Sequence, residues 1–246
     1  MDINLALMAG VDIPLPELKV TLHQPTIQDI ARMGEQDLFS AIHYLCLNKQ
    51  ALIEDKTLLK ELTNFQVLMK VIEQFDTSDK KISILTLFTL LFPNYKPIIT
   101  PNSIILNNFE TKENVIIDDN NFDNFQNVIK QVLCFNKLFQ GDNVTYNPVN
   151  EKAKEIAEKL IKGRKKAAAL KAKEEKENSV LGRYISILTI GVPSMSLESC
   201  LSLTLYQLFD LIERFTLYVE WNTDLEVRLA GGSPKSQAEN WMKNIH

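Results

Sequence analysis

The sequence predicts a mainly α-helical protein with a short edge strand and a small β-hairpin in its N-terminal domain and an all-helical C-terminal domain. Three observations lead to this prediction. Apolar residues recur at three- and four-residue spacing in most of the longer segments. Runs of β-branched residues are confined to residues 19–22 and 97–119. A stretch of turn-forming residues at 141–150 reads as a linker, so we expect a domain at 1–140 and another at 151–246.

The first elements follow from prolines and capping residues. A proline-rich start keeps the chain extended, and residues 19–22 are typical of a short edge strand. Thr26 and Asp29 form a partial capping box, which predicts the start of a helix. Gly34 interrupts this helix, and a second one continues with a single apolar face as far as Cys46.

Three further helices and a hairpin complete the predicted N-terminal domain. One helix lies within residues 58–75, and another begins near Ser78 and ends before Pro93. The second is apolar almost all round, which predicts a central position in the core. Residues 97–119 read as a small hairpin. Asn and Asp residues then offer caps for a helix that runs to Phe135.

The C-terminal domain begins with a basic segment. Residues 151–177 contain ten Lys and Arg against six Glu, a net charge of +4, so the other residues carry −8 of the total of −4. The apolar face of this predicted helix fades after Lys162, which indicates a helix that projects into solvent or binds a partner. A long amphipathic helix is predicted at 203–230, and Gly231 with Gly232 ends it.

Composition excludes several classes of protein. The chain has 246 residues, of which 45% are hydrophobic and 24% charged, so it can bury a large core without cross-links. Cys46, Cys134 and Cys200 lie apart in apolar runs, which favours buried thiols in a reducing compartment over disulfides. With three histidines and no Cys/His cluster, we expect no metal and no other cofactor.

The sequence also predicts a protein of the cytoplasm without contact with a membrane. The first residues lack the basic region of a secretory signal. The longest apolar run, residues 82–92, is much shorter than the roughly 20 residues that a membrane span requires.

No pattern in the sequence predicts catalysis, so we expect a protein that is not an enzyme. The glycines are scattered, and neither a phosphate-binding loop nor a Gly-x-Ser-x-Gly elbow occurs. His23 and His43 have no neighbour in sequence that would orient an imidazole as a base. Asp118 and Asp119 lie at a predicted helix start, where capping accounts for them.

Two groups of residues are candidates for partner binding. One is basic and begins at Lys162, and the other consists of aromatic residues in and after the long helix. The candidates are Lys162, Arg164, Lys165, Lys166, Tyr206, Phe209, Tyr218, Trp221 and Trp241. The basic group also fits a solvated helix face, and it lacks the interleaved aromatics that would favour nucleic acid. The aromatic group also fits an ordinary core.

Near the N-terminus, Leu7–Pro14 and Leu22–Glu35 read as a strand followed by a proline-led helix that ends near Gly-Glu. Near the C-terminus, the segments of interest are Leu205–Phe215, Arg228–Gly232 and Glu239–His246. These segments resemble tail assembly chaperones of tailed phages, and the C-terminal ones resemble those from phages of low-GC Gram-positive hosts. The chain differs from shorter members of that family by its hairpin and its basic segment.

The resemblance implies a protein without catalytic residues that works in the host cytoplasm. Such chaperones are thought to coat the hydrophobic tape measure protein while tail-tube subunits polymerise around it. The implied partners are therefore the tape measure protein, the major tail protein and further copies of the chain. Two alternatives stay open: a structural virion component, such as a tail or adaptor subunit, and a small regulatory or nucleic-acid-associated protein.

Overall fold

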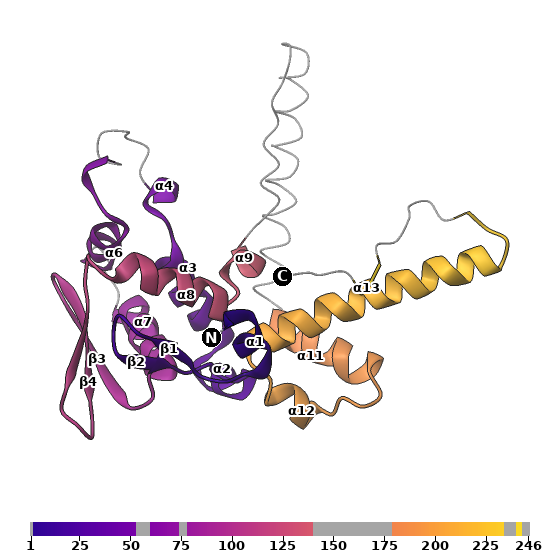
Figure 1. Ribbon diagram of the computed structural model, residues 1–246, viewed down its shortest axis with the longest axis horizontal. Helices are drawn as coiled ribbons and strands as arrows, with labels where there is room; N and C mark the ends of the chain where they lie inside the picture. Colours follow the sequence, from indigo (N-terminus) through magenta and orange to yellow (C-terminus); the bar gives the residue numbers. More distant parts are fainter. Residues whose placement is uncertain (1, 53–59, 74–77, 140–178, 234–239, 243–246) are drawn as a thin grey trace, which may run out of the picture.

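The computed structural model describes residues 2–52, 60–73, 78–139, 179–233 and 240–242, and it confirms the mainly α-helical fold (Figure 1). The helices are α1 (Ile3–Ala9), α2 (Ile27–Met33), α3 (Glu35–Cys46), α4 (Lys49–Leu52), α6 (Asn64–Glu73), α7 (Ser78–Leu91), α8 (Phe122–Val132), α9 (Phe135–Phe139), α11 (Val180–Gly191), α12 (Leu197–Leu201) and α13 (Leu205–Leu229). The strands are β1 (Ile13–Leu15), β2 (Val20–Leu22), β3 (Tyr95–Thr100), β4 (Ser103–Asn108) and β5 (Asn114–Ile117). Of these helices, none has the length and apolar character that a bilayer span needs.

The N-terminal segment is more ordered than its sequence indicates. The Asp2 carboxylate accepts hydrogen bonds from the first amides of α1, and Gly10 ends that helix in the left-handed conformation, with φ of +66°. The strand predicted at 19–22 is present as β2, and β1 pairs with it in antiparallel register with Ile13 opposite Leu22. The sequence predicted neither α1 nor β1.

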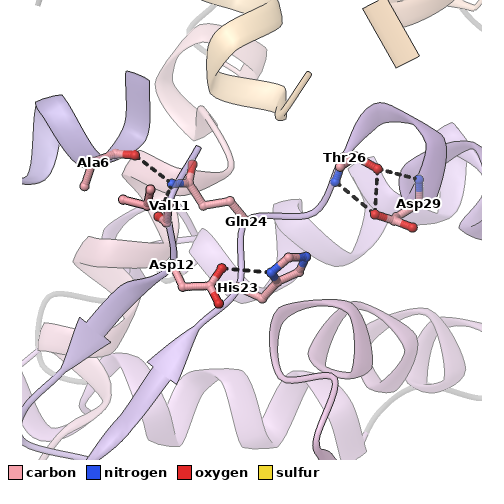
Figure 2. Close-up of polar contacts among 7 residues, drawn as sticks. All are labelled: Ala6, Val11, Asp12, His23, Gln24, Thr26 and Asp29. Carbon is pink, nitrogen blue, oxygen red and sulfur yellow. Dashed lines mark hydrogen bonds and ion pairs between the residues drawn. The ribbon is translucent and has the colours of Figure 1, made fainter. Parts of the chain in front are cut away.

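Helices α2 and α13 each begin with a capping box, and their starts lie side by side. The predicted box at α2 is confirmed, because the Asp29 amide donates to Thr26 Oγ1 at 3.2 Å while the Thr26 amide donates to Asp29 Oδ2 at 3.1 Å (Figure 2). The hydrogen bond from the Thr26 hydroxyl lowers the pKa of Asp29. Thr204 and Gln207 form the same box at the start of α13. An isolated antiparallel bridge between Thr26 and Thr204 holds the two helix starts together.

Gln24 fixes α1 to the rest of the fold. Its side chain is only 2% exposed, and its Nε2 donates to the carbonyl oxygens of Ala6, at 3.0 Å, and Val11, at 2.6 Å (Figure 2). Ala6 lies in the last turn of α1 and Val11 follows the end of the helix, so the side-chain amide of Gln24 fixes the backbone on both sides of that end. Gln24 Oε1 accepts no hydrogen bond within the residues that the structure describes.

We expect Gln24→Leu to lower the free energy of unfolding by about 1–3 kcal/mol, because the carbonyls of buried Ala6 and of Val11 both lose the amide group that donates to them. Urea unfolding followed by circular dichroism measures this loss. The control is Gln28→Leu, which makes the same change at an exposed position of α2. Equal stability of the two variants would show that the Gln24 amide does not hold this segment.

The predicted central helix is α7. Ile84, Leu87, Phe88 and Leu91 on this helix are each fully buried, and α3 packs along it. The prediction that the helix ends before Pro93 is also confirmed.

The predicted hairpin is part of a three-stranded antiparallel sheet with the order β3-β4-β5. The hairpin strands are β4 and β5, and β3 was missed because Pro97 interrupts its pattern. On the outer face, register places Ile105 opposite both Ile98 and Ile116. The Asn121 side chain donates to the Ile116 carbonyl at 2.9 Å, which occupies a backbone acceptor on β5.

The helix predicted to run to Phe135 is divided. α8 ends at Val132, Cys134 adopts a left-handed backbone with φ of +51°, and α9 begins at Phe135. This conformation is uncommon for a residue other than glycine. It turns the chain sharply, so α9 takes a new direction beside α3.

One hydrophobic core includes residues from both predicted domains. Leu188 of α11 and Leu208 of α13 belong to the same buried cluster as Leu38 and Phe88. The predicted linker, 141–150, and the basic segment, 151–177, lie outside the described residues. The division into two domains therefore stays a prediction.

Candidate partner-binding surface

Helix α13 has two halves with different environments. The first half lies in the core, where Leu205, Leu208 and Ile212 are at most 9% exposed. The second half extends away from the other helices, as the long yellow helix in Figure 1 shows. The capping box at Thr204 fixes its start, and the helix continues to Leu229, well past the core.

The apolar pattern of α13 continues where the core ends. Large hydrophobic side chains on the second half are therefore open to solvent: Tyr218 is 47% exposed, Val219 44%, Leu225 45%, Val227 36% and Leu229 79%. Isolated exposed apolar residues are normal on protein surfaces, but Tyr218, Leu225 and Leu229 share one face of the helix, and such a group is typical of a binding site. We call residues 218–229 the distal half of α13.

Helix α11 borders this surface. It packs against α13 at Gly191, where an added Cβ would lie only 2.3 Å from Phe215 Cζ. A side chain at this position would push the two helices apart. Ile187 and Ile190 of α11 are 38% and 83% exposed, so the apolar surface includes the end of this helix.

The structure separates the predicted aromatic residues into two groups. Tyr206 and Phe209 are 7% and 6% exposed and form part of the core. Phe209 meets Tyr184 of α11 edge-on, with ring centroids 5.6 Å apart. Burial raises the pKa of the Tyr206 phenol. These two side chains hold α13 in place and do not contribute to the exposed surface.

Of the remaining aromatic residues, Tyr218 and Trp221 lie on the distal half, and Trp241 packs against Tyr218. Trp241 meets Tyr218 edge-on at a centroid distance of 5.7 Å, and its carbonyl accepts a hydrogen bond from Arg214. Trp221 lies one turn beyond Tyr218 and is partly exposed. The role of these three residues in partner binding stays a prediction. Lys162, Arg164, Lys165 and Lys166 lie outside the described residues.

Charged side chains line the aromatic and aliphatic residues of the distal half. Arg228 Nε and Nη2 each lie 3.0 Å from Asp224 Oδ2, which fixes the guanidinium group along the helix. Glu220 and Glu226 are exposed. The surface therefore combines apolar contact area with charges of both signs.

A second apolar surface, which the sequence did not predict, lies on the outer face of the three-stranded sheet. Ile98 and Ile116 are 39% and 50% exposed, and Ile105 lies between them in register. Phe109, in the connection after β4, is 63% exposed. Alternation within each strand was visible in the sequence, but the register that aligns the three isoleucines was not.

The histidines and paired carboxylates have structural contacts. His23 Nδ1 lies 2.9 Å from Asp12 Oδ1, so the fold supplies the orienting partner that the local sequence lacks, through an exposed hydrogen bond. His43 packs against Phe139, and burial lowers its pKa. Asp119 accepts hydrogen bonds from Thr63 and Gln66 beside a hollow of about 430 Å³. Across the residues the structure describes, no three His, Cys, Asp or Glu side chains are grouped to hold a metal ion.

One comparison with known protein families matches the C-terminal part of the chain. A model of a protein family described as the YomV second domain matches residues 172–246, which include α11, α12 and α13. This family is phage-derived. A search of curated proteins gave no match, and neither did a search of solved structures. The match covers less than half of the chain, so it relates only the C-terminal part to that family.

Proposed function

We propose that the protein is a phage tail assembly chaperone without catalytic activity, and that it binds the hydrophobic tape measure protein in the host cytoplasm. The observation that carries the proposal is the exposed apolar surface of the distal half of α13, within the part of the chain that is similar to a phage-derived family. The resemblance at both ends of the chain supports the same role.

The geometry suits a helical client. A tape measure protein is a long, mainly helical chain whose apolar faces are uncovered until the tube forms around it. The distal half of α13 and the end of α11 offer aliphatic and aromatic contacts along one direction, which is how amphipathic helices are recognised. Charges of both signs on this surface would align such a client, and reversible binding would allow tube subunits to replace the chaperone.

We expect Leu225→Glu to weaken binding of the tape measure protein at least tenfold, because it places a charge at the centre of the proposed contact surface. Co-expression of the two proteins, followed by pull-down and measurement of the soluble tape measure fraction, tests this. Phe109→Glu is the matched control, since Phe109 is exposed on the other apolar surface. The proposal fails if the unaltered chain forms no complex and leaves the client as insoluble as before.

Mass spectrometry of purified particles separates this function from that of a structural virion component. A chaperone leaves the tail before it is complete, so we expect the chain in infected cells but not at stoichiometric levels in virions. A constant copy number per particle would favour a tail or adaptor subunit.

A further inference from the structure

A heptad repeat runs along α13 from the core into solvent. Its positions alternate in steps of three and four residues: Leu208, Leu211, Phe215, Tyr218, Asn222, Leu225 and Leu229. This spacing keeps two helices in contact along their length. We call these seven positions the seam.

Among the described residues, the core and α11 cover the first part of the seam, and beyond it Trp241 meets Tyr218 edge-on. Leu208 is fully buried, and Phe215 packs against Gly191 at the end of α11. Helix α11 ends at that point, whereas the seam continues for four more positions. The later seam positions therefore continue the line along which α11 packs against α13. Because their spacing is the same, the element that fits them is another helix.

We propose that this helix is the distal half of α13 from a second copy of the chain, and that the two helices pair in antiparallel orientation about a two-fold axis. A parallel pair is disfavoured because the α11 helices of both copies would meet at Phe215. In an antiparallel pair the two folded bodies lie at opposite ends. Such a contact is isologous and closes as a dimer.

Side chains of the distal half complement one another in this arrangement. Tyr218 lies opposite Leu229 of the second copy, and Asn222 lies opposite its Leu225. On one rim of the seam, Trp221 faces Arg228 of the second copy, whose guanidinium group Asp224 holds along the helix. A guanidinium group over an indole ring is a favourable cation–π pair, and symmetry forms it twice. The other rim places Glu226 beside Val219, so no two like charges meet.

The ends of the contact also fit. Beyond Leu229, the second copy presents Gly231 and Gly232, which have no side chains, to the exposed Ile190 at the end of α11. The overlap of residues 218–229 is about 18 Å long at the helical rise. This is short for a protein–protein interface, so we expect a reversible dimer with a dissociation constant on the order of 10 µM.

The inference goes beyond the proposed function and is tested on the chain alone. Sedimentation equilibrium of the full chain from about 1 to about 200 µM should show the mass rise from 28.1 kDa toward twice that value. Leu225→Glu should weaken the association at least tenfold. Leu197→Glu, at a 59% exposed position of α12 outside the seam, should leave it unchanged. Thermal unfolding verifies that each variant is folded.

Cysteine cross-linking tests the orientation. An equimolar mixture of Asn222→Cys and Leu225→Cys chains should form the mixed disulfide faster than either variant forms its own dimer. Parallel pairing would reverse this preference, because each residue would then lie opposite the same residue of the second copy. The proposal is wrong if the unaltered chain is monomeric throughout the concentration range, or if the single variants cross-link faster than the mixture. Client binding that survives in a strictly monomeric chain would leave the proposed function intact.

Discussion

Replacing Phe88 by alanine is expected to lower the free energy of unfolding by about 3–5 kcal/mol, a large part of the roughly 5–15 kcal/mol that stabilises a domain. Phe88 lies on α7, is fully buried, and stacks with Phe125 of α8 at a centroid distance of 5.9 Å and an interplanar angle of 10°. Its ring also stacks with Phe92 at 6.3 Å. Truncation removes both ring contacts and leaves a cavity in the buried core, which the packed side chains around it cannot fully close.

Urea unfolding of matched variants measures this effect. Phe88→Leu keeps most of the volume and should lose much less stability than Phe88→Ala. Phe109→Ala serves as the surface control, since Phe109 is 63% exposed, and its loss should stay within about 0.5 kcal/mol. A loss below about 1 kcal/mol for Phe88→Ala would contradict the central position of α7.

Elements with strong local signals were predictable from the sequence. The capping box at Thr26 and Asp29 fixed the start of α2, and the apolar run before Pro93 identified α7 as the central helix. Both signals depend on residues within a few positions of one another. The long helix α13 was predictable for the same reason, to within two residues at each end.

Elements that depend on distant contacts were not predictable. Helix α1 is too short to be stable alone, and Gln24 and Gln207 hold it by hydrogen bonds to its carbonyl groups. Strand β3 contains Pro97, which is tolerated because β3 is an edge strand of the sheet. The left-handed turn at Cys134 has no signature in the sequence, since glycine is the usual residue there.

The candidate surface was predictable only in part. Tyr206 and Tyr218 are the same residue type on one helix, and periodicity places both on apolar faces. What separates them is where the rest of the fold ends: Tyr206 lies in the core near Cys134, whereas beyond Gly191 helix α11 no longer covers α13. The end of α11 follows from its own sequence, because Pro193 comes two residues after Gly191, and not from the sequence of α13. The isoleucine row of the sheet depends in the same way on register.

The second large effect is expected at two buried thiols, Cys46 and Cys134. Each should react with thiol reagents about a thousand times more slowly in the folded chain than in the unfolded chain. Burial raises the pKa of Cys46 and of Cys134 from 9.0 to about 12. At pH 8 the reactive thiolate then falls from about one molecule in ten to about one in ten thousand. Labelling with a chromophoric disulfide, with and without denaturant, measures both rates. Rapid labelling of Cys46 in the folded chain would contradict its burial.

The same shift makes stability depend on pH. Between pH 9 and pH 12 the folded chain retains protons that the unfolded chain has already released, so the unfolded state binds fewer protons. The stabilisation is therefore complete below pH 9 and is lost progressively as the pH rises toward 12. Urea midpoints should fall over this range, and they should fall less steeply in the variant that combines Cys46→Ala with Cys134→Ala, because alanine releases no proton. Equal slopes in the two proteins would mean that other groups, such as lysine and tyrosine side chains, cause the alkaline loss of stability.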